Sequence, residues 1–375
     1  MTHAPDDDDP GPNVVVRADG HGAAPSDIVE MGSGTEFDLI RDLLAKVNPA
    51  ARTGTGTGAD LGAHVAGGGG VWLGAGDDAA VIDAGRLVVS TDLSVEDVHF
   101  RRSWVTFAEA GARAVIAAAS DLAAMAAAPV AVLISLAVAP GEAQAVLSGL
   151  GDGIKSALKE LGVPLVGGDL AASPGPVVID VTVVGEAEKP VTRSGAHPGD
   201  ELWVTGVLGG SAGAVRAWRD GAEPGPNLRA SFVRPTARIK EARWLADHVQ
   251  VRAMIDLSDG LAGDAGHLAA ASGVRIVLDP RLVPVHPDLI AQDAPSLAIS
   301  GGLAMSGGED YELCFVSPPG VTGPRASEFQ ERFGIGLTRV GHVEEGTGVE
   351  VVGEAVGRDH VSGGFDHFSS RGGSC

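Results

Sequence analysis

Aspartates follow several apolar runs of this 375-residue chain, at positions that could support chemistry. Three of these runs are Leu87-Val88-Val89, Pro164-Leu165-Val166 and the segment that ends at Ile255. The acids and the hydroxyl residues beside them are Asp77, Asp78, Ser90, Thr91, Asp92, Asp121, Asp169, Asp256 and Asp259. Carboxylates at the ends of buried elements suit hard divalent cations, and Mg²⁺ is usually bound through a few carboxylates together with substrate phosphates. The pattern therefore predicts metal-assisted phosphate chemistry.

The first two groups of acids each have a structural alternative. Adjacent Asp77 and Asp78 repel each other, so a nearby cation favours them, but Asp in a turn is also common for local hydrogen bonding. Ser90-Thr91-Asp92, expected at a strand end, offers hydroxyl, backbone carbonyl and carboxylate ligands. The alternative for this triplet is a Ser/Thr turn or a helix N-cap.

Asp121 stands alone in an alanine-rich segment that is predicted to be helical. A buried unpaired carboxylate is costly, so Asp121 should be paired, capping or bound to a metal, unless a polar stripe of the helix faces water. An extended backbone would place Asp256 and Ser258 on one face. Ser258 and Asp259 are also candidate N-caps for the helix that follows.

Two glycine-rich stretches could approach a phosphate closely. Gly167-Gly168-Asp169 is expected to close a strand, where the glycines permit close approach of a ligand. Residues 205–213 lie between a predicted strand and a predicted helix, as a phosphate loop would. They lack the Gly-Lys-Ser/Thr ending of a Walker A motif, and tight strand–helix packing explains them equally well.

The net charge of -22 argues against DNA, RNA and acidic membranes as partners, because phosphate backbones are bound by basic patches. Bound Mg²⁺ would offset the repulsion between this surface and a nucleotide. Cys314 and Cys375 have no spacing that suggests a disulfide framework or a zinc site, so we expect a reducing, cytoplasmic location.

Two segments bear on membrane association and targeting. Leu122 to Gly141 has no charged residue and is long enough to span a bilayer. Pro129 divides it, however, and we predict the end of a buried helix, a break, and a strand over 130–139. Residues 1–9 are polar and acidic, without the pattern of a secretory signal, and we expect a soluble protein.

The chain length suits two domains. We predict a disordered arm at 1–33, an N-terminal domain at 34–190, a C-terminal domain at 191–368 and a flexible tail at 369–375, with a Gly-rich loop at 53–70. Strands are predicted at 80–82, 87–90, 130–138, 177–184, 201–205, 275–278, 311–316 and 338–342. Helices are predicted at 108–127, 143–161, 211–219, 237–248 and 259–271. This mixture indicates an α+β fold rather than a regular βαβ series.

Taken together, the motifs resemble those of the thiamine-monophosphate kinase family, within the superfamily that includes aminoimidazole ribonucleotide synthetase. The matching segments are Gly76-Asp77-Asp78, Ser90-Thr91-Asp92, His99-Phe100, residues 120–125, Gly167-Gly168-Asp169, residues 192–200, residues 255–261, residues 306–313 and residues 364–368. The resemblance implies an α+β, two-domain aminoimidazole ribonucleotide synthetase-like fold, with N-terminal domains pairing into a β-barrel in a homodimer. It also implies ATP-dependent phosphorylation of thiamine monophosphate to thiamine diphosphate, the final step of thiamine diphosphate biosynthesis.

The resemblance also implies roles for individual residues. The implied Mg²⁺ ligands are Asp78, Ser90, Thr91, Asp92, Asp121, Asp169, Asp256 and Asp259. The implied ATP site contains Gly168, Asp169, Arg193 and Ser258. The implied contacts to thiamine monophosphate come from His99, Glu309 and Phe365. Asp78, Asp92, Asp121, Asp169 and Asp256 are the implied catalytic residues. Asp97 and Leu170-Ala171-Ala172 depart from the usual family pattern.

Because both reactants are anionic phosphates, several Mg²⁺ ions would screen their repulsion during direct in-line transfer, and no covalent nucleophile is needed. Another ATP-dependent enzyme of the superfamily is the nearest alternative. A selenophosphate synthetase should have a reactive N-terminal Cys, and a hydrogenase-maturation enzyme a different ending before its last Cys. A non-catalytic nucleotide- or thiamine-binding protein is the alternative from another class, and it should have lost some of the aspartates.

Overall fold

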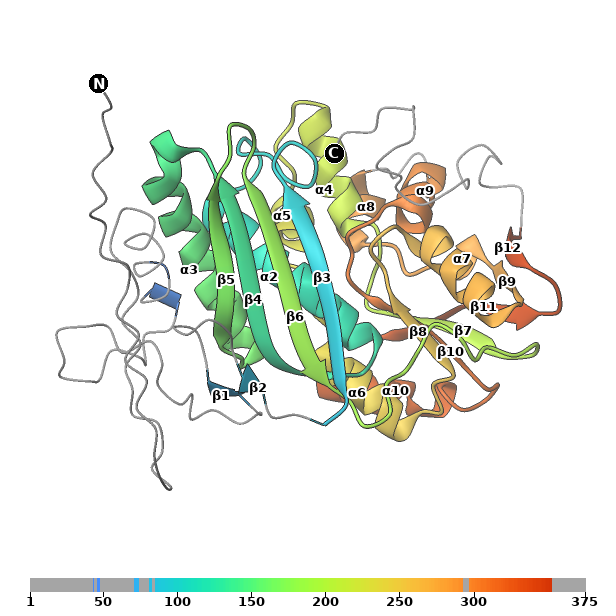
Figure 1. Ribbon diagram of the computed structural model, residues 1–375. Helices are drawn as coiled ribbons and strands as arrows, with labels where there is room; N and C mark the ends of the chain where they lie inside the picture. Colours follow the sequence, from blue (N-terminus) through green and yellow to red (C-terminus); the bar gives the residue numbers. More distant parts are fainter. Residues whose placement is uncertain are drawn as a thin grey trace, which may run out of the picture.

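The computed structural model describes residues 85–291 and 301–352 in full (Figure 1). It also describes Leu43, Lys46 and Val47, and the backbone of 71–73, 81–82, 292 and 297–300. The predicted arm at 1–33, the Gly-rich loop at 53–70 and the tail at 369–375 therefore lie outside the described residues, as do Asp77, Asp78, Phe365 and Cys375.

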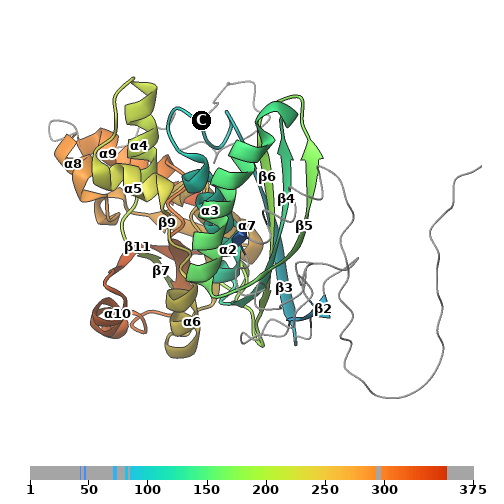
Figure 2. The same cartoon turned by 90° about the vertical axis from the view of Figure 1, so that its left-hand side faces the viewer.

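The N-terminal half is a four-stranded sheet with two helices on one face (Figure 2). The strands, in spatial order, are β3 (Leu87–Val95), β6 (Val178–Glu186), β4 (Ala128–Val138) and β5 (Leu165–Ala172). The helices are α2 (Phe107–Ala124) and α3 (Ala143–Leu161). Thr106 and Glu109 form a capping box that starts α2, and Gly162 ends α3 in the left-handed conformation. Both helices bury apolar residues against the sheet.

Two strands are longer than the sequence predicted, and this changes where their polar residues lie. Ser90-Thr91-Asp92 lies inside β3 rather than at its end, because β3 pairs with β6 along all of its nine residues. Gly168 and Asp169 likewise lie inside β5, paired with Ile134 and Ser135 of β4. Side chains alternate along a strand, so Ser90 and Asp92 share the face toward α2 while Thr91 points to the opposite face.

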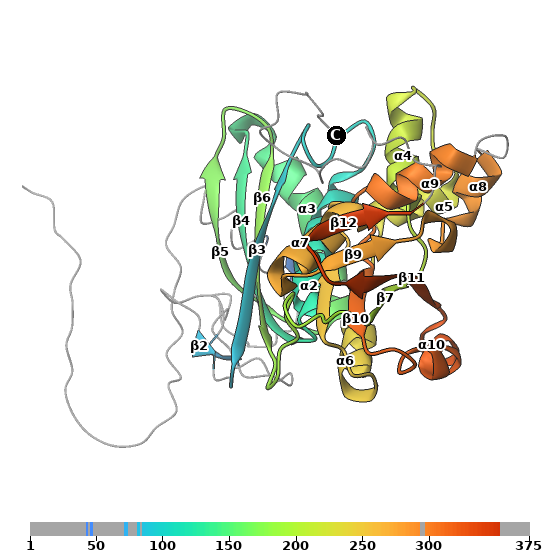
Figure 3. The same cartoon turned by 90° about the vertical axis from the view of Figure 1, so that its right-hand side faces the viewer.

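The C-terminal half is a six-stranded sheet with helices around it (Figure 3). In spatial order its strands are β12 (Gly348–Val351), β9 (Arg275–Leu278), β11 (Leu337–Glu344), β7 (Glu201–Thr205), β10 (Leu313–Ser317) and β8 (Ala253–Asp256). Its helices include α4 (Gly210–Arg219), α5 (Pro226–Val233), α6 (Ile239–His248), α7 (Leu261–Ser272), α8 (Pro287–Gln292), α9 (Leu297–Ser306) and α10 (Ala326–Phe333). Strand β8 lies at the edge of this sheet, where α2 of the other half contacts it.

Aromatic stacking and an ion pair join the two halves beside α2. The rings of Trp104 and Trp218 stack with centroids 5.3 Å apart. Arg229 of α5 pairs with Glu109 in the first turn of α2, with Nη1 and Oε1 2.7 Å apart. The two halves therefore meet over packed side chains, and α2 is shared between them.

The segment that could have been mistaken for a membrane span is divided as predicted. It contains the end of α2, a turn and all of β4, but the break comes at residues 125–127 and Pro129 lies inside the strand rather than at the break. No helix among the described residues is long and apolar enough to cross a membrane. Helices α5, α8, α9 and α10 and strand β12 were not predicted. Cys314 is a buried free thiol in β10.

Candidate active site

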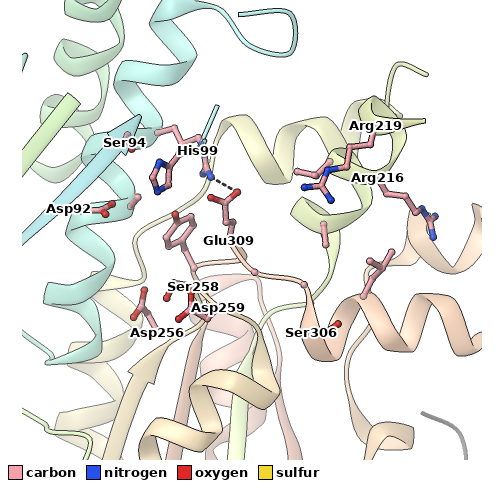
Figure 4. Close-up of a pocket in the computed structure, with 18 of the residues that line it drawn as sticks. Asp92, Ser94, His99, Arg216, Arg219, Asp256, Ser258, Asp259, Ser306 and Glu309 are labelled. Atoms are coloured by element: carbon pink, nitrogen blue, oxygen red, sulfur yellow. Dashed lines mark ion pairs between the residues drawn. The ribbon is translucent and has the colours of Figure 1, made fainter. Parts of the chain in front are cut away.

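A cavity of about 660 Å³ lies between the two halves and brings most of the described candidate residues together (Figure 4). The candidates that line it are Asp92, His99, Asp121, Asp256, Ser258, Asp259 and Glu309. They come from β3, the loop after it, α2, the end of β8, the loop before α7 and the loop between α9 and β10. Neither half could form this cavity alone.

One end of the cavity is acidic. Asp92 lies on the inner face of β3, Asp121 in the last turn of α2, and Asp256 at the last position of β8. Burial and the nearby Asp121 raise the pKa of Asp92 above its usual range, and the same two causes raise the pKa of Asp256 to about 7. Added positive charge would favour the ionised forms, so this donor set fits hard divalent cations.

Ser90 takes part in this acidic end through Asp121. Its hydroxyl donates a hydrogen bond to Asp121 Oδ2. This hydrogen bond links β3 to α2, and it agrees with the expectation that Asp121 should have a partner.

The loop after β8 is held by an acid that the sequence analysis did not select. The carboxylate of Asp264, in the first turn of α7, accepts a hydrogen bond from the Asp259 N–H (3.1 Å). The N-cap of α7 is Gly260 at φ 100°, without a side-chain cap, so the prediction that Ser258 or Asp259 caps this helix is wrong. A Cβ on Gly260 would lie 2.8 Å from the carbonyl carbon of Ser306, so glycine is needed there.

His99 lines the cavity, and a hydrogen bond fixes which of its ring nitrogens carries the proton. The Val95 N–H donates to His99 Nδ1 (3.0 Å), so the neutral ring carries its proton on Nε2 and offers a hydrogen-bond donor there. The surrounding turn is fixed by Glu96, which accepts hydrogen bonds from Arg102 and from the Val177 N–H. Asp97 occupies the left-handed region at φ 66°, which Asp tolerates better than most residues.

Polar groups at the N-terminus of α4 already form hydrogen bonds with the loop between α9 and β10. The Asp310 carboxylate accepts a hydrogen bond from the Gly209 N–H (2.8 Å), and the Ser211 hydroxyl donates to the Glu309 carbonyl (2.7 Å). A Cβ on Gly210 would lie 2.5 Å from Ser231 Oγ. The glycines of 205–213 therefore serve tight packing, and the phosphate-loop alternative is not supported.

Arg113 is the main cavity residue that the sequence analysis missed. It lies on α2 with its side chain buried, and its Nη2 is 2.6 Å from Glu309 Oε2. The available signal was spacing, because Arg113, Ala117 and Asp121 are four residues apart and all three line the cavity. Arg216 and Arg219 of α4 line the side of the cavity away from Asp92 and Asp256 (Figure 4).

Comparison with known proteins places this chain in a family. Residues 76–187 match the AIR synthase related protein N-terminal domain, and residues 197–358 match the corresponding C-terminal domain. The thiamine-monophosphate kinase of Mycobacterium tuberculosis is 40% identical over 256 residues, which cover 66% of this chain and 76% of the relative. The chain belongs to the thiamine-monophosphate kinase family. The two-domain AIR synthase-like fold with mixed α and β content is thereby confirmed.

Solved structures of thiamine-monophosphate kinases agree with this assignment. The enzyme from Stenotrophomonas maltophilia K279a superimposes with a TM-score of 0.71 at 31% identity, covering 86% of this chain and 98% of the other. AaThiL in complex with AMPPCP and TMP superimposes with a TM-score of 0.66 at 32% identity, covering 78% of this chain and 91% of the other.

Some residues that the thiamine-monophosphate kinase resemblance selected do not line the cavity. The Thr91 hydroxyl donates to Asp180 Oδ1 (2.8 Å) on the outer face of the sheet. Asp169 is exposed, and its carboxylate accepts from the Leu170 N–H. Arg193 is exposed as well, but its charge lowers the pKa of Asp256 against the larger effect of burial, so it lies near the acidic end.

Gly168 is fixed by its neighbours. A Cβ on this residue would lie 1.9 Å from the Ile134 carbonyl oxygen of the adjacent strand. Glycine is therefore required for strand packing whether or not a nucleotide approaches here.

Proposed function

We propose that this protein transfers the γ-phosphoryl group of ATP to thiamine monophosphate, giving thiamine diphosphate and ADP. The observation that carries the proposal is the single cavity in which carboxylates from both halves lie beside His99 and Glu309, in a chain of the thiamine-monophosphate kinase family. A related structure, AaThiL, is complexed with AMPPCP and TMP, which supports the same pair of reactants.

We further propose that the acidic end holds several Mg²⁺ ions through Asp92, Asp121, Asp256 and Asp259. Burial and the nearby Asp121 raise the pKa of both Asp92 and Asp256, which supports a site that is completed by cations. Bound Mg²⁺ would screen the repulsion between the two phosphate-bearing substrates and stabilise charge on the transferred group. The substrate phosphate oxygen is already ionised at neutral pH, so the chain need not supply a general base.

The remaining ligands and contacts are proposed from the family resemblance. Asp78, Ser90, Thr91 and Asp169 complete the Mg²⁺ ligands, with Thr91 contributing its backbone carbonyl because its hydroxyl points to the outer face. Gly168, Asp169, Arg193 and Ser258 bind ATP. Phe365, His99 and Glu309 bind thiamine monophosphate, with His99 donating from Nε2.

A homodimer is proposed from the outer face of the N-terminal sheet. Leu87, Val89 and Leu93 of β3 lie on this face and are 45%, 60% and 49% exposed. A row of apolar side chains on a strand is costly in water and is expected to be covered. Pairing of two such sheets into a β-barrel would cover it, with domains at 34–190 and 191–368 in each protomer. A cytoplasmic location stays a prediction.

The decisive test is an assay of purified protein with ATP, Mg²⁺ and thiamine monophosphate that follows thiamine diphosphate directly. Equal amounts of ADP and thiamine diphosphate, both abolished by a chelator, are expected, and no phosphoenzyme should accumulate. Hydrolysis of ATP without thiamine diphosphate would contradict the acceptor and favour another enzyme of the superfamily. Binding of ATP without turnover would favour a non-catalytic protein.

A further inference from the structure

One side of helix α2 faces the cavity, with Arg113 near its start and Asp121 near its end. Arg113 and Asp121 are eight residues apart, with Ala117 midway, and all three line the cavity. Residues four apart lie on the same side of a helix. The Asp121 carboxylate and the ion pair with Glu309 are therefore connected by two turns of one rigid element.

The Arg113 guanidinium is enclosed on several sides. The residue is 5% exposed, and its Cζ lies 4.1 Å from the centroid of the Phe232 ring and 5.6 Å from that of Tyr311. Its Nη1 donates to the Phe232 carbonyl oxygen (3.4 Å), and its Nη2 pairs with Glu309 Oε2 at 2.6 Å. A planar guanidinium held between rings has little freedom, so the direction of this ion pair is fixed.

Glu309 has an unusual backbone conformation, and its side chain is partly buried. It adopts φ 68°, and its N–H donates to the Ser258 carbonyl oxygen (2.9 Å). Arg113 belongs to the N-terminal half, but its guanidinium bonds to two residues of the C-terminal half, Glu309 and Phe232. Burying a carboxylate without a cation would be costly, and removal of Arg113 would leave Glu309 uncompensated.

We propose that Arg113 is a positioning residue for the substrate site: it holds the Glu309 carboxylate aimed into the cavity, at a fixed distance along α2 from the carboxylate of Asp121. Glu309 Oε2 is bound to Arg113, which leaves Oε1 to accept from the amino group, or to face the cationic ring, of the acceptor. This inference rests on the proposed function, in which Glu309 contacts thiamine monophosphate.

The first test compares steady-state kinetics of Arg113→Met and Arg113→Lys with wild type. Arg113→Met should raise KM for thiamine monophosphate by about 30-fold, since truncating one partner of a buried pair commonly costs more than a factor of 10, while KM for ATP changes less than about twofold. Arg113→Lys keeps the charge but loses the stacked fork and should lie in between. The double variant with Glu309→Gln should be no worse than Glu309→Gln alone.

Arg229→Met is the matched control. Arg229 also joins α5 to α2 through a partly buried ion pair, with Glu109, but it does not line the cavity. Loss of this pair should leave both KM values within about twofold of wild type. Equal rises in the two KM values for Arg113→Met, or additive effects with Glu309→Gln, would overturn the positioning role.

A second readout does not depend on turnover. Amide hydrogen exchange, measured without substrate, should be faster at Glu309 and Tyr311 in Arg113→Lys and Arg113→Met than in wild type, because these amides are bonded to Ser258 and Leu257 across the loop. Arg229→Met should leave them protected. Unchanged protection would overturn the inference. Wild-type protein that does not phosphorylate thiamine monophosphate would overturn the proposed function separately, while the exchange data would still decide whether Arg113 orders Glu309.

Discussion

Replacement of Asp310 by Asn should change how stability depends on pH. Burial raises the pKa of Asp310 from 3.8 to about 7, an effect that the Gly209 amide opposes and the neighbouring Glu312 reinforces. Between these two values the folded protein keeps a proton that the unfolded chain has released, so the free energy of unfolding falls as pH rises. Each pKa unit corresponds to about 1.36 kcal/mol and Asp310 is already half ionised at pH 7, so it should lower the stability by about 2 kcal/mol between pH 5 and pH 7.

The assay is urea unfolding of wild type and Asp310→Asn at a series of pH values in the same buffer, followed by tryptophan fluorescence. The other carboxyl groups titrate in both proteins, so the difference between the two curves isolates Asp310. The stability of the variant relative to wild type should rise by about 2 kcal/mol from pH 5 to pH 7 and become level above about pH 8. Parallel curves would refute the reasoning. An opposite slope would mean that the N-terminus of α4 stabilises the anion more than burial destabilises it.

Asp92→Asn should abolish turnover with little change in thermal stability, since it removes a proposed metal ligand without changing size; near-normal kcat would contradict the assignment. Ser90→Ala should lower kcat more than Thr91→Val, because only the Ser90 hydroxyl binds a cavity carboxylate; the reverse order would place the Thr91 hydroxyl in the site. Leu93→Glu should convert a dimer to monomer in analytical ultracentrifugation, because charge on an apolar face opposes its burial, and an unchanged mass would exclude that face.

Local patterns in the sequence predicted much of the fold. Helix α3 and strands β7 and β9 have the predicted bounds, because each is defined by its own apolar periodicity and flanking turn residues. Strand β3 does not end at Ser90, because its continuation through polar residues depends on pairing with β6, which lies far along the chain. Pairing of this kind leaves no local signal.

The site was predictable where acids follow buried elements, as with Asp256 at the end of β8. Arg113 and Asp264 were missed for a different reason. A charged residue in a helix usually faces water, and only tertiary packing shows that these two are buried with partners. Residues of this kind are recognised by their hydrogen-bond and ion-pair partners, which are distant in the sequence and become visible only in the folded structure.

The segment from Glu309 to Glu312 has a consequence for how such a chain can change over generations. Glu309 pairs with Arg113, Asp310 receives the Gly209 amide, and the Tyr311 N–H donates across the loop. The Glu312 carboxylate accepts hydrogen bonds from Arg238, the N-cap residue of α6, and from Thr205 of β7. A substitution at Glu309, Asp310 or Glu312 removes a side-chain bond to a different neighbour, so each loss would need its own compensating change in a distant part of the chain. We expect Glu309, Asp310 and Glu312 to tolerate fewer substitutions than the exposed residues of α10.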